Sequence, residues 1–137
     1  MNICRWVLPL CLVFLLPSCA AAGHGGLAGK PLDFYFIDAE GGAATLIVTP
    51  AGQSLLVDTG NPGTRDADRI AAAAKEAGIT RIDYLVVTHY HSDHFGGAPE
   101  LAKLLPIGTL YDNADQNTST EKPSAAYLRM VVGKRIM

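Results

Sequence analysis

The sequence predicts an α/β domain built on a mixed sheet. Three observations support this fold class. Short apolar segments separated by turn residues run from position 33 to 57, a segment with helical period follows them, and a nearly continuous apolar stretch then occupies 83–88. A chain of 137 residues is long enough for one modest domain.

The first three strands are expected over 33–37, 44–49 and 54–57. Each is short and rich in aromatic or branched apolar residues, which is typical of strands. Pro50-Ala51-Gly52 lies between the second and third segments and suits a tight reversal of the chain. These two strands should therefore form a β-hairpin.

The spacing of the apolar residues then changes, and predicted helices alternate with predicted strands. Ile70, Ala74 and Ala77 are spaced as on one helix face, so 66–77 is predicted to be an amphipathic helix that ends at Gly78. Its successor, 83–88, is typical of a strand buried on both faces. The remaining elements are expected to be a helix over 100–105 that Pro106 closes, a strand over 108–111, a polar loop over 112–123 and a helix over 124–132.

Composition excludes several kinds of chemistry. Eleven Lys and Arg against 13 Asp and Glu give a formal charge of −2, so no basic surface for nucleic acid is indicated and no nucleic-acid partner is expected. All three cysteines, Cys4, Cys11 and Cys19, lie within the first 22 residues. The rest of the chain can form neither a disulfide nor a thiolate metal site.

The first 22 residues are predicted to be a signal peptide. Arg5 precedes an apolar run, Trp6 to Leu16, that is too short to span a bilayer. Leu16-Pro17-Ser18-Cys19 is similar to a bacterial lipobox, which would place cleavage before Cys19 and a lipid on that cysteine. A cut after Ala20-Ala21-Ala22, before Gly23, is the alternative, and a buried N-terminal helix is a third reading.

Export would place the protein in the bacterial cell envelope, lipid-anchored or periplasmic, or outside the cell. Membrane contact is expected only through a lipid on Cys19. Residues 23–31 are rich in glycine, include His24 and are expected to be a flexible linker, with the domain occupying 32–137.

A cluster of metal-binding residue types follows the predicted strand 83–88. His89, His91, Asp93 and His94 fall within six positions, just before the pair Gly96-Gly97. Residues two apart in extended chain point the same way, so His89 and His91 can reach one ion. Asp93 and His94 come next on a turning backbone and should point elsewhere, toward a second ion. The alternative is a surface loop whose histidines hold no ligand.

Thr88-His89-Tyr90-His91-Ser92-Asp93-His94 resembles the His-x-His-x-Asp-His signature of the metallo-β-lactamase superfamily of metal-dependent hydrolases, and Leu55-Leu-Val-Asp58-Thr59-Gly60 resembles that family's second hairpin strand. The resemblance covers about 33–111. It implies a four-layer αββα fold of the α+β type, of which this chain would hold mainly the N-terminal β-layer with its helices.

The resemblance also implies roles. His89 and His91 would hold the first of two divalent ions, and Asp93 and His94 the second, with Asp93 also catalytic. Zinc is favoured for an imidazole-rich set, with iron or manganese as alternatives. Asp58 would lie beneath the loop and orient the ligands without touching the ions, although an ordinary turn aspartate is the alternative.

Other residues leave alternatives open. Asp38 and Glu40 lie where DNA-processing members of the superfamily carry Asp-x-Gly-x-Gly-Asp, but Glu40 and Ala43 depart from that pattern, which weakens a nuclease reading. Solvated turn carboxylates are the other possibility for this pair. Tyr90 and Phe95 could line a substrate pocket or simply pack.

The ligands that would complete a two-metal site in this family are not evident in the sequence. No histidine follows His94, and the later aspartates, Asp112 and Asp115, are poor candidates for a bridging ligand because they lie in a polar stretch close to the motif. We therefore expect the N-terminal half of a longer hydrolase that acts on an unidentified small-molecule substrate through a metal-activated water. The alternatives are an inactive truncated metal-binding fragment and an envelope binding module.

Overall fold

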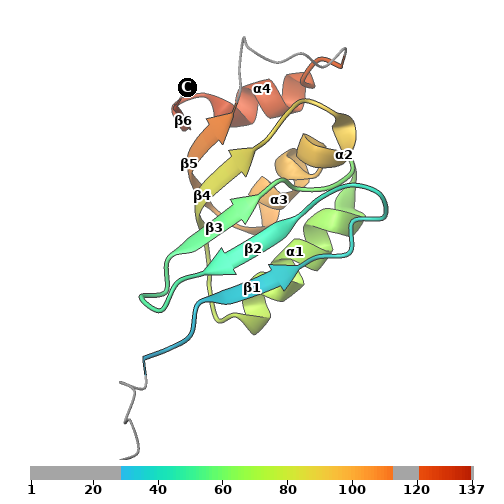
Figure 1. Cartoon of the computed structure of the whole chain (residues 1–137). Coiled ribbons are helices and arrows are strands. Elements are labelled where there is room, and N and C mark those ends of the chain that lie inside the picture. Colours follow the sequence, from blue (N-terminus) through green and yellow to red (C-terminus); the bar gives the residue numbers. More distant parts are fainter. Residues whose placement is uncertain (1–28, 113–120, 137) are drawn as a thin grey trace, which may run out of the picture.

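The structure, a computed structural model, describes residues 29–112 and 121–136. The predictions on the signal peptide, Cys19, His24 and Asp115 lie outside these residues. As expected, the fold is a mixed sheet with helices; the sheet has six strands, and the helices lie on one of its faces (Figure 1). None of the helices in the described ranges is long and apolar enough to cross a membrane.

The strands lie in the sheet in the order in which they occur in the chain. The first three pair antiparallel, and each later strand pairs parallel to the one before it. The expected hairpin is formed by β2 and β3, and Gly52 at its turn takes a φ of 82°. The strands are β1 (Asp33–Phe36), β2 (Thr45–Val48), β3 (Ser54–Val57), β4 (Ile82–Val87), β5 (Ile107–Asp112) and β6 (Arg135–Ile136).

One face of the sheet packs against the helices α1 (Thr64–Glu76), α2 (Ser92–Phe95), α3 (Ala98–Leu104) and α4 (Ala125–Val131). The strands contribute Leu46, Leu56, Leu85 and Leu110 to this core, and the helices contribute, among others, Ile70, Leu101 and Tyr127; all seven are fully buried. Removal of this apolar surface from water is the main term that stabilises the domain.

The opposite face of the sheet is not covered by any described element. The strand register aligns Phe34 with Ile47, Ile47 with Leu55, and Leu55 with Tyr84 across this face. Side chains on it are exposed, Phe36 by 82% and Tyr84 by 38%. The prediction that the strand at 83–88 is buried on both faces is therefore wrong for the described chain, because helices lie on one side only.

Several predicted boundaries change. The first helix begins at Thr64 rather than at position 66, and Ser92–Phe95 forms a short helix where only a turn was expected. The expectation of a loop from position 112 is wrong for Asp112, which ends β5. Arg135 and Ile136, which follow the last predicted helix, form β6 beside β5.

Candidate metal centre

The functional residues predicted from the sequence gather at one edge of the sheet. β3, β4 and β5 are parallel, so their carboxyl ends meet there. Asp58 follows β3 directly, the histidine loop, residues 88–96, follows β4, and Asp112 ends β5. Crevices at the carboxyl ends of parallel strands are where α/β sheets commonly bind ligands.

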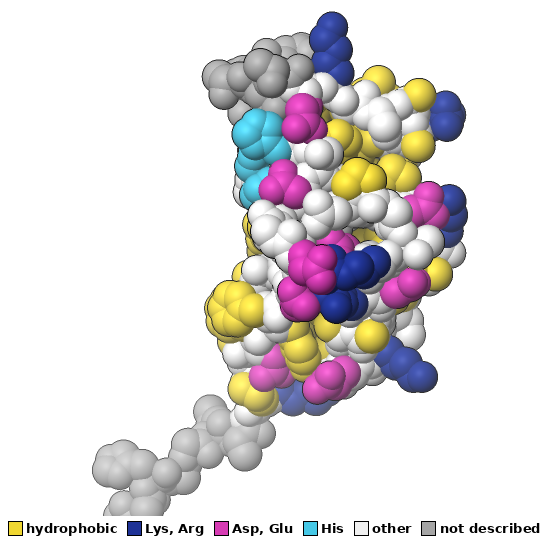
Figure 2. Space-filling model, turned by 90° about the vertical axis from the view of Figure 1, so that its right-hand side faces the viewer, with side chains coloured by type: hydrophobic (Ala, Val, Ile, Leu, Met, Phe, Trp, Pro, Cys, Tyr) yellow, Lys and Arg dark blue, Asp and Glu magenta, His cyan; other side chains and the backbone are white. Residues whose placement is uncertain are grey.

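Three imidazole rings lie against one another in the histidine loop. Nε2 of His89 is 3.0 Å from Nδ1 of His91, and the ring centroids of these residues are 4.6 Å apart. The rings of His89 and His94 are closer, with centroids at 4.0 Å. We expected His94 to point away from His89 and His91, but its ring lies against that of His89. In Figure 2 the histidine side chains form one patch with acidic side chains beside it.

Asp58 lies beneath this loop and is only 2% exposed. Its Oδ1 accepts a hydrogen bond from the backbone N–H of Thr88 at 2.8 Å, and its Oδ2 accepts one from the Thr88 hydroxyl at 2.8 Å. The same Oδ2 is 2.8 Å from Nδ1 of His94. Asp58 also takes a positive φ of 60°, a left-handed conformation that aspartate tolerates better than most residues.

This network fixes which ring nitrogens carry protons. An ionised carboxylate only accepts hydrogen bonds, so Nδ1 of His94 is the protonated nitrogen and its Nε2 is free. The Thr88 hydroxyl donates to Asp58 and accepts from Nδ1 of His89, 3.0 Å away, which leaves Nε2 of His89 free as well. Nδ1 of His91 then donates to that nitrogen, and an ion bound between the two rings would take the place of this proton.

The donor set suits a divalent ion in chemistry and in spacing. Two imidazole nitrogens bound to one tetrahedral zinc ion at about 2.0–2.1 Å would lie roughly 3.3 Å apart, and those of His89 and His91 already lie 3.0 Å apart. Within the described ranges, however, no three His, Cys, Asp or Glu side chains converge to hold an ion by themselves. Oδ2 of Asp93 is 3.9 Å from Nε2 of His94.

Close backbone approach locks the loop onto its neighbours. A Cβ on Gly42 would lie 2.3 Å from the carbonyl oxygen of Asp93, and one on Gly97 would lie 2.1 Å from that of Thr59. The N–H of Thr59 donates to the carbonyl of His94 at 2.6 Å, and the N–H of Ala43 donates to that of Asp93 at 3.1 Å. Glycine is required at both positions because any side chain would displace the loop.

A buried polar network that the sequence did not reveal lies under the same loop. The Asp112 side chain is fully buried and accepts hydrogen bonds from the hydroxyls of Tyr90 and Tyr127, each at 2.8 Å. Arg135 donates to it from Nε at 2.7 Å and from Nη2 at 2.8 Å, and Nη2 also contacts the Tyr90 hydroxyl. Asp112 is therefore occupied by this network rather than by the histidines.

Burial and charge shift the pKa values in this network. Burial and the hydrogen bond to Asp112 raise the pKa of Tyr90 to about 12, and the same two causes raise the pKa of Tyr127. Burial alone would raise the pKa of Asp112, but hydrogen bonds from Arg135, Tyr90 and Tyr127 outweigh it, and the pKa falls below 3.8. At neutral pH the network thus contains a carboxylate, a guanidinium and two neutral phenols.

Tyr90 and Phe95 pack rather than line a pocket. Both are buried, and with Tyr127 they form three edge-to-face contacts with centroids 5.2 to 5.8 Å apart.

Glu121 is a further residue that the sequence did not single out. Its Oε2 accepts a hydrogen bond from the N–H of Ser92, at 2.7 Å, at the start of α2.

Asp38 and Glu40 form an exposed ion cluster with α1. Glu40 is 2.8 Å from Nη2 of Arg65, and Asp38 contacts Arg69 through its carboxylate. The backbone N–H of Glu40 and the guanidinium of Arg69 lower the pKa of Asp38. These carboxylates are therefore paired turn residues.

The mixed sheet and the three histidines in the loop after β4 indicate the class of protein to which the chain belongs. The family model described as the metallo-beta-lactamase superfamily matches residues 37–132. The chain belongs to the metallo-beta-lactamase superfamily.

Among its relatives, the chain is 36% identical over 110 residues to a UPF0173 metal-dependent hydrolase of Cupriavidus necator, covering 73% of this chain and 36% of that protein. It is 37% identical over 75 residues to an atrochrysone carboxyl ACP thioesterase of Emericella nidulans, covering 53% and 24%. The chain thus spans about a third or less of the length of these two relatives.

Solved structures include two similar chains. The metallo-beta-lactamase SMB-1 is 28% identical, with a TM-score of 0.47, over 57% of this chain and 29% of that one. MEM-A1, a subclass B3 metallo-beta-lactamase from a soil metagenome library, is 30% identical, with the same TM-score and coverage.

Proposed function

We propose that the histidine loop holds divalent metal ions and that the protein hydrolyses a small-molecule substrate. The observation that carries this proposal is the gathering of three imidazoles and a carboxylate at the carboxyl end of β4, above a buried aspartate that fixes the protonation of His94 directly and of His89 through Thr88. Membership of a superfamily whose relatives include metal-dependent hydrolases supports it.

In this proposal His89 and His91 hold the first ion, and Asp93 and His94 hold the second. Zinc suits imidazole nitrogen, with iron and manganese as alternatives. These residues would thereby supply two chemical effects to a bound substrate, a lowered pKa of water and stabilisation of the negative charge that would develop on a scissile carbonyl or phosphoryl oxygen.

The chain's own residues have separate tasks. Asp58 keeps the proton of His94 on Nδ1 and so presents Nε2 to an ion. Thr88 does the same for His89 by relaying the hydrogen bond to Asp58. Asp93 is proposed as the catalytic residue because its side chain, 36% exposed, can accept a hydrogen bond from the attacking water.

A second candidate is a metal-binding chain without turnover. It is favoured by the lack of a third converging donor among the described residues, since a catalytic zinc ion takes three protein ligands. In that case further donors would come from a longer protein. A binding module of the envelope without metal chemistry is the third possibility, and the retention of all four motif residues speaks against it.

Metal analysis and hydrolysis assays separate these candidates. The purified 137-residue chain is analysed for bound zinc, iron and manganese and is assayed with a generic ester and a phosphodiester. His91→Ala and a chelator should abolish both binding and turnover, whereas His24→Ala, which changes the one histidine outside the loop, should not. Binding without turnover supports the second candidate, and less than about one equivalent of metal contradicts the metal proposal.

We also propose export to the cell envelope, with Cys19 as the lipid-anchored residue of the processed chain. The apolar run ending in Leu16-Pro17-Ser18-Cys19 supports this proposal. Radiolabelled fatty acid should be incorporated into the wild-type protein and not into Cys19→Ser. Labelling of neither would support cleavage before Gly23 instead.

A further inference from the structure

The histidine loop is attached to the rest of the domain by its two inward-facing aromatic residues. His89 and His91 are half-buried or exposed, while Tyr90 between them is only 4% exposed. Phe95, at the other end of the loop, is 5% exposed. Both rings contact the ring of Tyr127 on α4. Alternation of side chains along the loop therefore puts the histidines outside and the attachment inside.

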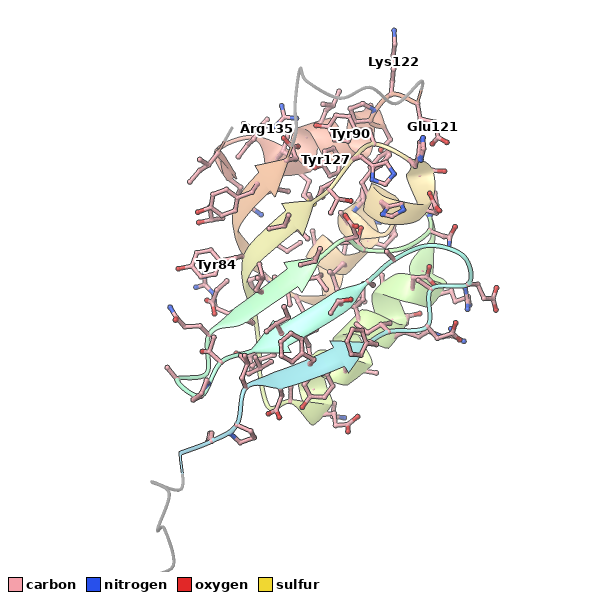
Figure 3. The ribbon with its side chains drawn as sticks, in the orientation of Figure 1. Tyr84, Tyr90, Glu121, Lys122, Tyr127 and Arg135 are labelled. Atoms are coloured by element: carbon pink, nitrogen blue, oxygen red, sulfur yellow. The ribbon has the colours of Figure 1, made fainter. Side chains whose placement is uncertain are left out.

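The Tyr90 hydroxyl is held more specifically than packing requires. It donates a hydrogen bond to Asp112 of β5 at 2.8 Å, and Arg135 of β6 contacts the same oxygen. Three segments that are distant in the sequence thus meet at one phenol oxygen. Figure 3 shows Tyr90, Tyr127 and Arg135 together at this end of the sheet.

Stability alone does not account for such a network. A buried ion pair loses so much hydration that an apolar set of similar volume is often equally stable. What a buried polar network adds is a single permitted arrangement, because each donor and acceptor must be met in its place. Here the group held in place is the backbone between two candidate metal ligands.

We propose that Tyr90, Asp112 and Arg135 form a clamp that positions the backbone of the histidine loop so that His89 and His91 face one ion. These are positioning residues and touch neither metal nor substrate. The role in metal binding rests on the proposed function, whereas the fixing of the loop by the clamp does not.

Tyr127 provides a matched control. Tyr90→Phe and Tyr127→Phe each delete one hydroxyl that donates to the same Oδ2 of Asp112 at 2.8 Å. Both rings are retained, and both side chains are buried. The two variants differ in that only Tyr90 lies in the histidine loop and only its hydroxyl also contacts Arg135.

Residue-resolved amide hydrogen exchange on the metal-free protein tests the clamp. In Tyr90→Phe the amides of His94 and Gly96, which bond within the loop, should exchange about tenfold faster, the factor that one ordinary hydrogen bond is worth. The amides of Leu128 and Lys134 should change less. In Tyr127→Phe the amides of Leu128 and Lys134 should instead be accelerated more than those of His94 and Gly96, because Leu128 and Lys134 report on α4 and the turn before β6.

Equal acceleration at all four amides in both variants would mean that the network only adds global stability, and it would overturn the clamp. So would unchanged exchange at His94 and Gly96 in Tyr90→Phe. Asp112→Asn, which keeps the side-chain size, should reproduce the loop effect of Tyr90→Phe. If that variant does not fold, the pair of tyrosine variants decides alone.

Metal titration extends the test to function. Tyr90→Phe should bind Zn²⁺ about 10–100-fold more weakly than wild type, as variants of residues that orient ligands do, and its Co²⁺ absorption spectrum should change. Tyr127→Phe should retain wild-type affinity and spectrum. Wild-type protein that binds no metal would contradict the proposed function while leaving the exchange result to decide the clamp. Equal loss of affinity in both variants would overturn the positioning role.

Discussion

Oδ2 of Asp58 lies 2.8 Å from Nδ1 of His94, and the same carboxylate bonds to the backbone and the hydroxyl of Thr88. One buried aspartate after β3 thereby holds the histidine loop at both Thr88 and His94. A carboxylate with so little exposure is retained because its hydrogen bonds offset the cost of desolvation.

Asp58→Asn should weaken zinc binding by about 10–100-fold. The amide oxygen can still accept the hydrogen bond from the Thr88 backbone N–H. The NH₂ group that replaces Oδ2 cannot accept a hydrogen bond from Nδ1 of His94 or from the Thr88 hydroxyl. Nδ1 of His94 is then no longer held in its protonated form. Zinc affinity is measured by competition with a coloured chelator at a temperature where each variant is folded.

Asp66→Asn is the control for this variant. Asp66 is also buried, but it accepts hydrogen bonds from Asn61 and pairs with Arg65 instead of touching a histidine. It should lose stability and keep wild-type zinc affinity. Equal weakening in both variants would mean that Asp58 acts only through general stability.

Gly42→Ala should destabilise the fold and disturb the loop. Its Cβ would lie 2.3 Å from the Asp93 carbonyl oxygen, so Asp93 must move, at a cost of about 1–3 kcal/mol in the free energy of unfolding. Urea unfolding measures this loss, and metal affinity should fall with it.

Gly41→Ala is the matched change next in the chain. Gly41 has a φ of 85° but open space around its Cβ position, so alanine there carries backbone strain of about 1 kcal/mol and no collision. Its metal affinity should remain that of wild type. If Gly41→Ala perturbs zinc binding as strongly as Gly42→Ala, the contact with Asp93 is not the cause.

The sequence predicted the hairpin, the first helix and the location of the histidine loop because each depends on a local pattern. The spacing of Ile70 and Ala74 and the stop at Gly78 are sufficient for α1. The positions of His89 and His91 follow from the end of an apolar strand.

The clamp could not be predicted in the same way, because its members lie 22 to 45 residues apart. Asp112 sits at the start of a polar stretch and therefore has the appearance of a loop residue. Its burial depends on Arg135, and Arg135 reaches it only because β6 adds to β5. The prediction that the strand at 83–88 is buried on both faces failed for the same reason. An apolar strand is recognisable in the sequence, but distant segments decide what covers each of its faces.

Acid should unfold the protein partly through Asp112. Its pKa is lowered in the folded state, so its ionised form contributes stability above 3.8, and that contribution is lost as pH falls through the lower folded value. Urea unfolding between about pH 3 and pH 7 should show stability falling at the acid end in wild type. Asp112→Asn should be less stable at pH 7 and flatter across the acid range.

Asp38→Asn is the comparison for that titration. The pKa of Asp38 is also lowered, by the N–H of Glu40 and by Arg69, but the side chain is exposed, so water screens its interactions. Its acid limb should stay close to that of wild type. An acid limb in Asp112→Asn as steep as in wild type would show that other carboxylates govern acid unfolding.

The uncovered face of the sheet should make this chain self-associate. Phe34 is 52% exposed and Phe36 82%, with centroids 6.5 Å apart, and both project from the edge strand β1. Apolar patches of this kind on a monomer promote association, and an edge strand adds free backbone groups.

Phe36→Glu should raise solubility and lower the sedimentation-derived mass. Leu104→Glu changes another exposed apolar side chain, on α3 and away from this face, and should leave both close to wild type. If the helix-side variant disperses the protein equally well, net charge rather than the sheet face controls association, since each change adds one negative charge to a chain of −2.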